Sequence, residues 1–200
     1  MKLFYSPGAC SLSPRIALLE AGAPFEAVKV GRDKQTSDGR DFLALNPYGY
    51  VPALELDDGE ILTEGPAIVQ YIADRWPDAG LAPPNLTIER YRLQAALGFI
   101  NSEVHKTVSG LFNPALQDDE RERIVGKVDT RLTQLSRKME GHEWILGDDF
   151  SVADIYLFVV TRWFAGLKLD LARWPVIAAH HARVRARPAT QAALAAEGLA

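Results

Sequence analysis

The chain has 200 residues, 48% of them hydrophobic and 24% charged, with a formal net charge of −4 at pH 7. These values are typical of an ordinary globular protein, and the negative charge argues against nucleic acid as the main partner. The single cysteine excludes an internal disulfide, and the four histidines lack the spacing of a zinc site. The opening apolar run is too short for a signal peptide, and no stretch is long enough to span a membrane. We therefore expect a cytoplasmic, metal-free protein without a nucleic-acid or membrane partner.

The opening residues predict a strand, a loop and a helix. Lys2–Tyr5 are typical of a short strand, and Ser6–Ala9 end it with a proline and a glycine. Pro14 suits the first turn of a helix, because its missing N–H would have no intrahelical partner there. Ser11 and Ser13 lie at the start of that helix, so their hydroxyls are candidate caps for its free N–H groups.

Cys10 lies in the loop before this predicted helix. The positive end of a helix favours a thiolate over a thiol, and the thiolate is the reactive form of cysteine. We therefore expect the pKa of Cys10 to lie below the free value of about 8.5. The alternative is a small buried hydrophobic residue, which is the commoner role of a free cysteine.

The following elements predict an α/β domain over residues 1–78. In order, they are a strand at 25–30, a short helix at 41–45, a hairpin with strands at 51–56 and 60–62 joined by an Asp-Gly turn, and a helix at 67–73. The first two strands flank a helix and should be parallel. The order β-α-β-α-β-β-α is that of a thioredoxin-like domain. In such a domain Pro52 is cis and exposes the N–H and C=O groups of the preceding residue; an ordinary turn proline is the alternative.

The second half predicts an all-helical domain. Residues 79–86 form a Pro-rich linker, and no strand signal follows, so the helical domain is expected to span 87–200. Residues 87–112 predict one long helix with an apolar stripe. A second stripe on this helix carries small and polar residues, namely Tyr91, Ala95, Gly98, Ser102 and His105. Small residues in a row let another backbone or a ligand come close.

Three further helices are expected. The first carries Ile124, Val128, Leu132, Leu135 and Met139 on one side. The second begins at Ser151, which can cap the helix while Asp154 bonds back to it, and its apolar residues 155–164 should form the core of this half. We interpret Asp154 as a structural cap and not as a catalytic residue. The third begins at Trp174-Pro175 and ends at Pro188, before an alanine-rich tail.

Several segments, taken together and in order, resemble the glutathione transferases, and their details look like the bacterial beta class. They are residues 6–14, 46–52, 62–68 and 103–106, with the cap at 151–154 as a fifth. The resemblance covers essentially the whole chain. It implies the glutathione transferase fold, a homodimer, and glutathione as a cosubstrate.

The resemblance also implies a glutathione site in the first half, and the chemistry of its residues agrees. Gly65 opens a helix whose free N–H groups suit a carboxylate, and Glu64 beside it can pair with an amino group. Val51 offers backbone hydrogen bonds to the cysteinyl part of glutathione, Lys34 meets the glycine carboxylate, and Cys10 is catalytic. Taken alone, Glu64 could equally be a helix-start carboxylate, and Lys34 would be a surface lysine.

The second half contributes the remaining residues that the resemblance implies. Ser102, His105 and Lys106 surround the thiol and the far wall of the site, and His105 is catalytic. The hydrophobic electrophile binds against Phe112 and Trp163. One departure is Gly98, where close relatives usually carry an asparagine that reaches the partner subunit's glutathione, so that contact should be absent.

The expected function is detoxification, in which glutathione is conjugated to hydrophobic electrophiles. Cys10 can also form a mixed disulfide with glutathione, so thiol-disulfide exchange is expected beside conjugation and could be the main activity. Ser13 stands where a dithiol redox protein would hold its second cysteine, so no internal disulfide could release Cys10. A third possibility is a non-catalytic binding protein of the same fold.

Overall fold

The computed structural model describes residues 1–199, which form two compact units. The first unit contains residues 1–82 together with the chain from Ala186 onward, and the second contains residues 83–185. The break between them falls inside the predicted linker. None of the helices in the described chain is long and apolar enough to cross a bilayer.

The first unit is built on a four-stranded mixed sheet with the strand order β2-β1-β3-β4. Its elements are β1 (Lys2–Tyr5), α1 (Leu12–Glu20), β2 (Glu26–Lys29), α2 (Phe42–Leu45), β3 (Ala53–Glu55), β4 (Ile61–Thr63), α3 (Gly65–Arg75), the 3-10 turn η1 (Pro77–Ala79) and α9 (Pro188–Ala196). Strands β1 and β2 are parallel, whereas β3 pairs antiparallel with β1 and with β4. This confirms the predicted thioredoxin-like order.

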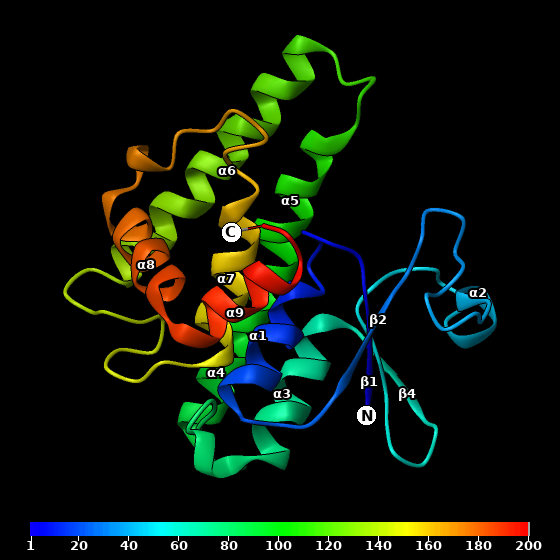
Figure 1. The fold of residues 1–200 in the computed structure, drawn as a ribbon. Coiled ribbons are helices and arrows are strands. Elements are labelled where there is room, and N and C mark those ends of the chain that lie inside the picture. Colours follow the sequence, from blue (N-terminus) through cyan, green and yellow to red (C-terminus); the bar gives the residue numbers. More distant parts are fainter. Residues whose placement is uncertain (200) are drawn as a thin grey trace. The chain divides into compact units, whose positions relative to one another are not determined.

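Strand β1 is buried on both faces of the sheet. Side chains alternate between the faces of a strand, so Leu3 and Phe4 point in opposite directions, and both are fully buried. Phe4 packs in a cluster with Val28, Phe42 and Ala53. Figure 1 shows α2 on one side of the sheet and the helices α1 and α3 on the other. The central strand is therefore held between two layers of helix.

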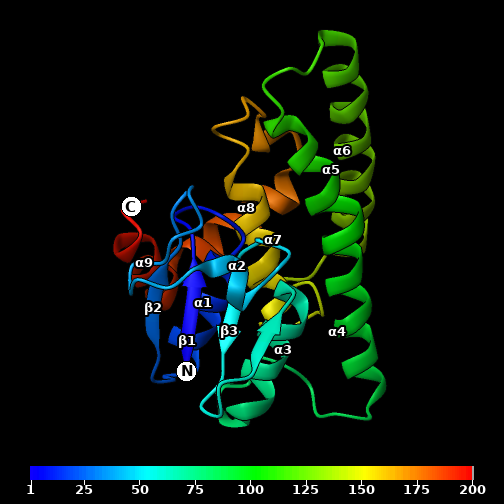
Figure 2. The same ribbon diagram turned by 90° about the vertical axis from the view of Figure 1, so that its right-hand side faces the viewer.

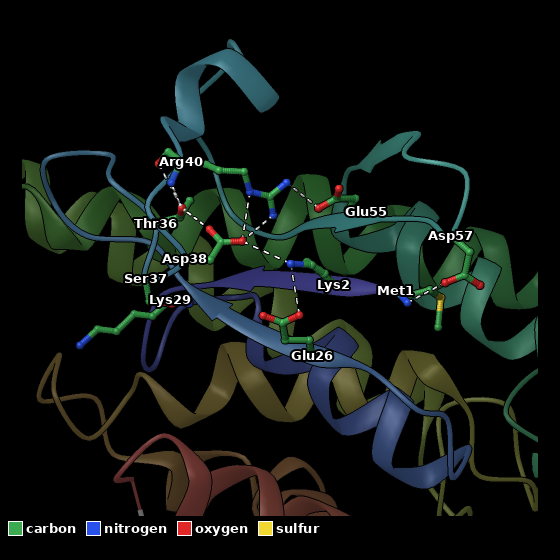
Figure 3. A network of polar contacts seen from close by, with 10 residues as sticks. All are labelled: Met1, Lys2, Glu26, Lys29, Thr36, Ser37, Asp38, Arg40, Glu55 and Asp57. Carbon is green, nitrogen blue, oxygen red and sulfur yellow. Dashed lines mark hydrogen bonds and ion pairs between the residues drawn. The ribbon is translucent and has the colours of Figure 1, made fainter.

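The loop after β2 is tied to the sheet by a network of charged side chains (Figure 3). Arg40 donates to Asp38 from Nε at 3.0 Å and from Nη2 at 2.8 Å, and it pairs with Glu55 of β3 at 2.9 Å. Lys2 of β1 also reaches Asp38, at 3.5 Å. The hydrogen bonds from Arg40 are the main reason why the pKa of Asp38 is lowered to about 2. The loop that carries Lys34 is thus fastened to two strands.

Helices make up the second unit. Its elements are α4 (Ile88–Phe99), the π-helical segment η2 (Ile100–His105), α5 (Lys106–Ser109), the 3-10 turn η3 (Gly110–Phe112), α6 (Asp118–Lys138), α7 (Val152–Arg162), the 3-10 turn η4 (Leu171–Arg173) and α8 (Pro175–Ala186). The predicted helix over 87–112 is confirmed as one helical stretch, which changes type at residue 100 and runs beside α6 (Figure 2).

Helix α7 is the core of this unit, as predicted, because residues 152–161 are all buried. The predicted capping box at its start is present. The Ser151 hydroxyl accepts from the Ala153 N–H at 3.3 Å, and the Ser151 N–H donates to Asp154 Oδ2 at 2.8 Å. Asp154 Oδ1 also accepts from the Ile145 N–H and from His180 Nε2, both at 2.9 Å. Asp154 therefore joins the start of α7 to a loop and to α8.

The helical domain was predicted to span 87–200, whereas the chain from Ala186 onward forms a compact unit with residues 1–82. The alanine-rich tail forms α9, which begins at Pro188 and packs against α1 of the first unit. Beyond α9, the fully buried side chain of Glu197 pairs with Arg15 at 3.1 Å and accepts from the Gly8 N–H at 2.8 Å. The packing of α9 against α1 was not predictable from sequence, because alanine is tolerated on every face of a helix and the segment has no distinct apolar stripe.

Candidate functional site

In the first unit, Val51 and Pro52 lie close to two other predicted site residues, Cys10 and Gly65. The Sγ atom of Cys10 lies 3.4 Å from the carbonyl oxygen of Val51. The Val51–Pro52 peptide bond is cis, as expected for a thioredoxin-like domain. Pro52 in turn lies against the start of α3, because a Cβ built on Gly65 would be 3.8 Å from Pro52 Cγ. The fold thus gathers Cys10, Val51 and Gly65 from three separate parts of the chain.

Lys34 joins the same segment from the loop after β2. Its Nζ atom donates to the Gly49 carbonyl at 2.7 Å. Gly49 is buried with a φ of +68°, and a Cβ there would lie 3.0 Å from Leu43 and 3.7 Å from the Lys34 side chain. Glycine is therefore favoured here by the positive φ and by the tight approach of the Leu43 side chain, whereas the Lys34 side chain lies at an ordinary contact distance.

The environment of Cys10 overturns the predicted lowering of its pKa. Burial raises the pKa of the Cys10 thiol to about 11, and the Glu64 carboxylate adds to the rise. The N–H groups of Cys10 and Ser11 act in the opposite direction but do not outweigh burial. The thiol also donates to the Val51 carbonyl, which a thiolate cannot do. Cys10 is therefore a neutral thiol near pH 7.

The two serines beside Cys10 do not cap α1, contrary to the prediction. The Ser11 hydroxyl donates to the Ser6 carbonyl at 3.3 Å and accepts from the Ser6 N–H at 3.2 Å. The Ser13 hydroxyl donates to the Cys10 carbonyl at 2.9 Å. Both hydroxyls form hydrogen bonds with residues that come earlier in the chain. They therefore stabilise the loop that carries Cys10 and leave the helix start without a side-chain cap.

At the start of α3, the backbone N–H groups differ in whether they have a partner. Pro66 has no N–H, and the N–H groups of Ala67 and Ile68 both donate to the Glu64 carbonyl. Within the described residues, the Gly65 N–H is the donor left without a protein partner. Glu64 is exposed and has a φ of +68°, a conformation that is uncommon outside glycine and recurs at functional sites.

In the second unit, His105 is surrounded by aromatic side chains. Its ring centroid lies 4.9 Å from that of Trp163, which in turn meets Phe112 at 5.6 Å in an edge-to-face contact. Its Nδ1 atom lies 2.6 Å from the Tyr156 hydroxyl. Burial lowers the pKa of His105 to about 4, and the Lys106 ammonium group adds to the lowering. The ring is therefore neutral near pH 7.

The other predicted residues of this unit lie on its surface. Ser102 and Lys106 are exposed, and the Ser102 hydroxyl donates to the Gly98 carbonyl at 3.0 Å. The prediction did not include Tyr156, which is 2% exposed and contacts His105. A signal for it exists in the sequence, since a tyrosine inside an otherwise apolar helix needs a hydrogen-bond partner.

Comparison with known families covers most of the chain. Residues 8–75 match the family model described as the N-terminal domain of glutathione S-transferase. Residues 99–188 match the family model described as its C-terminal domain. The two matches correspond to the thioredoxin-like sheet and to the helical unit, so the fold and the family models agree.

Individual proteins give the same result. The glutathione S-transferase GstA of Escherichia coli O157:H7 is 44% identical over 200 residues, covering 100% of both chains. A sphingomonad glutathione S-transferase solved in complex with glutathione has a TM-score of 0.96 at 50% identity, with 100% of both chains covered. The bacterial beta-class enzyme of Sphingomonas chungbukensis has a TM-score of 0.95 at 50% identity, again with full coverage. The chain belongs to the glutathione S-transferase family of enzymes and to its bacterial beta class.

Proposed function

We propose that this protein conjugates glutathione to hydrophobic electrophiles. In this reaction the glutathione sulfur loses its proton and forms a bond to an electrophilic carbon, while the leaving group departs with its electron pair. The observation that carries the proposal is the gathering of Cys10, Lys34, Val51 and Gly65 around one backbone segment. The solved complex of a 50% identical relative with glutathione supports the choice of ligand.

The polar groups of the first unit match the charges of glutathione, a tripeptide with an α-amino-carboxylate at one end and a second carboxylate at the other. We assign the α-carboxylate to the Gly65 N–H at the positive end of α3 and the amino group to the exposed Glu64 carboxylate. Val51 offers its backbone to the cysteinyl part. Lys34 provides a cation for the glycine carboxylate.

The second unit supplies groups for the reaction and for the second substrate. A neutral imidazole can accept the thiol proton, so His105 is proposed as the base. Lys106 and Ser102 are proposed to bind glutathione beside it. The edge-to-face pair of Phe112 and Trp163 offers apolar aromatic surface, which suits a hydrophobic electrophile.

Two assays and one binding measurement test the proposal. Conjugation of glutathione to a chlorodinitroaromatic compound should proceed, and calorimetric titration should show glutathione binding. A glutathionylated disulfide tested in parallel measures the competing thiol-transferase activity. Glutathione binding without either activity would instead identify a non-catalytic binding protein.

Lys34→Met should weaken glutathione binding, whereas Lys29→Met, at an exposed position of β2, should not.

Thiol-disulfide exchange through Cys10 is the second candidate function. The Cys10 thiolate would attack oxidised glutathione, forming one protein–glutathione disulfide and releasing one glutathione thiolate. Because burial raises the pKa of Cys10 to about 11, the thiolate fraction should grow about tenfold for each pH unit between pH 7 and pH 10. The rate of adduct formation, followed by mass spectrometry, should rise accordingly, and the adduct should reach one glutathione per chain.

Cys10→Ala should gain no glutathione and should retain part of the conjugating activity. An adduct on that variant would exclude this role of Cys10.

We also propose that the protein is a homodimer that uses the exposed face of α4. Ala95 and Gly98 of α4 are exposed, as is Ser102 in the η2 segment that continues the helix, and a Cβ built on Gly98 would meet no atom within 4 Å. Two-fold dimers bury the same patch on both chains. Sedimentation at micromolar concentration should give twice the chain mass. Ala95→Arg should shift the protein toward monomer, whereas Ala179→Arg, at an exposed position of α8, should not. A monomeric wild-type protein would contradict this prediction.

A further inference from the structure

Three polar side chains of the second unit form a chain of hydrogen bonds. His105 and Asn101 both belong to the π-helical segment η2, four residues apart, and Tyr156 belongs to α7. The Tyr156 hydroxyl lies 2.6 Å from His105 Nδ1 and donates to Asn101 Oδ1 at 2.8 Å. The segment is widened to π-helix, as the bond from the Lys106 N–H to the Asn101 carbonyl shows. Such widened turns recur at functional sites.

The directions of these hydrogen bonds follow from the number of available protons. The Tyr156 hydroxyl has one proton, and Asn101 Oδ1 can only accept, so that proton lies between them. The Tyr156 oxygen must then accept, and the Nδ1 atom of His105 must donate. A neutral imidazole has only one N–H, so its Nε2 atom carries a lone pair. Within residues 1–199, that lone pair has no protein hydrogen-bond partner.

The plane of the His105 ring is also held by packing. The ring lies 5.7 Å from the Tyr156 ring, with an angle of 86° between the two planes. Trp163 packs on it at 4.9 Å with an interplanar angle of 58°. Tyr156 itself is 2% exposed, in the buried core helix of the unit. A hydroxyl fixed in this way gives the imidazole a defined partner, which a mobile water would not.

We propose that Tyr156 and Asn101 are positioning residues that hold His105 in its Nδ1–H tautomer and leave Nε2 as the only acceptor on the ring. This inference rests on the proposed function, because it is the role of His105 as a base that makes the tautomer matter. In the opposite tautomer Nε2 would carry the proton and could not receive one from a thiol. The two residues therefore decide whether a neutral His105 can act as a base through Nε2.

Two substitutions break the chain of hydrogen bonds at different points. Tyr156→Phe removes the hydroxyl, so Nδ1 loses its acceptor. Asn101→Leu keeps the hydroxyl but frees its proton, which can then be donated to Nδ1 and so reverse the bond. Both variants should move the proton of His105 from Nδ1 to Nε2. Because the second variant leaves Tyr156 in place, it retains the packing of the core helix.

The same unit offers a matched control at another histidine. The Thr161 hydroxyl donates to the Leu157 carbonyl at 2.9 Å and lies 2.9 Å from Nδ1 of His181. Thr161→Val removes this oxygen from the same helix, α7, with little change of shape. It should alter the spectrum of His181 and leave both the spectrum of His105 and the turnover number unchanged.

Nitrogen-15 NMR of the ring atoms reads the tautomer without any activity measurement. Near pH 7 the wild-type His105 signals, identified by their loss in His105→Gln, should show a protonated Nδ1 and an unprotonated Nε2. In Tyr156→Phe and Asn101→Leu the pattern should shift toward a protonated Nε2. A protonated Nε2 in the wild type, or an unchanged Nδ1–H pattern in both variants, would overturn the inference.

Kinetics completes the test. In both variants the turnover number should fall about tenfold, part of the factor of about 10² to 10⁴ that a positioned base contributes, while the KM for glutathione stays within about twofold. An unchanged turnover number in both variants would reject the positioning role, even if the tautomer shifts. A wild-type protein without transferase activity would reject the proposed function and, with it, the role of Tyr156 and Asn101 in catalysis. The nitrogen-15 spectra would still show independently which tautomer His105 adopts.

Discussion

Replacing His105 with alanine is expected to lower the turnover number for conjugation about 100-fold, because a positioned base contributes a factor of about 10² to 10⁴. The KM for glutathione should change much less, since the proposed binding groups Glu64, Gly65, Lys34 and Lys106 all remain in place. Steady-state kinetics with varied glutathione gives both constants. His142→Ala is the control, because His142 is exposed. An unchanged turnover number with a raised KM would show that His105 only binds.

The pH profile of the wild-type enzyme provides a second reading of His105. A base must be neutral to accept a proton, and burial lowers the pKa of His105 to about 4. The turnover number should therefore hold as the pH falls through the ordinary histidine value of about 6.5 and decrease only as it approaches 4. A loss of turnover centred near pH 6.5 would mean that the imidazole titrates as an exposed histidine does.

Replacing Asp154 with alanine is expected to lower the free energy of unfolding by about 4 kcal/mol. Removing the carboxylate leaves the N–H groups of Ser151 and Ile145 and the Nε2–H of His180 without their acceptor. Each orphaned buried donor costs about 1 to 3 kcal/mol. Asp154 and His180 have no exposed side-chain surface, so water cannot replace the lost bonds in place.

Urea unfolding measures this change as a shift of the midpoint at constant slope. Asp149→Ala is the matched control, because Asp149 is an exposed carboxylate near the start of the same helix and should change stability by less than about 0.5 kcal/mol. The Ser151 hydroxyl also donates to Asp154, so His180→Phe removes one of four donors and should cost less than Asp154→Ala. A loss below about 1 kcal/mol for Asp154→Ala would show that the loop and the helix start rearrange to recover the bonds.

The elements of the fold were predictable from sequence because their signals are local. The proline in the first turn of α1, the Asp-Gly turn between β3 and β4, and the capping box of α7 each act over a few residues. Hydrophobic periodicity extended the prediction to the long helix over 87–112. It did not reveal the π-helical segment at 100–105, because the pattern of buried residues passes through that segment without interruption.

The candidate site was only partly predictable. Family resemblance named Cys10, Lys34, Val51 and Gly65, and the structure brings them to one backbone segment. The family resemblance did not name Tyr156, whose hydrogen-bond partners His105 and Asn101 are 51 and 55 residues away in the sequence. Contacts of that separation depend on how helices pack, and no local pattern encodes them.

The sequence by itself determined the order of strands and helices, the thioredoxin-like topology and the structural role of Asp154, since short-range sterics, turns and caps govern all three. Only the tertiary structure decided the protonation states of Cys10 and His105. A helix N-terminus alone predicts a reactive thiolate at Cys10, but burial raises the pKa of that thiol to about 11. The placement of α9 against α1 and the direction of the hydrogen bonds around His105 were likewise decided by packing. Desolvation and long-range contacts depend on which surfaces the folded chain covers, and that is set by the whole chain at once.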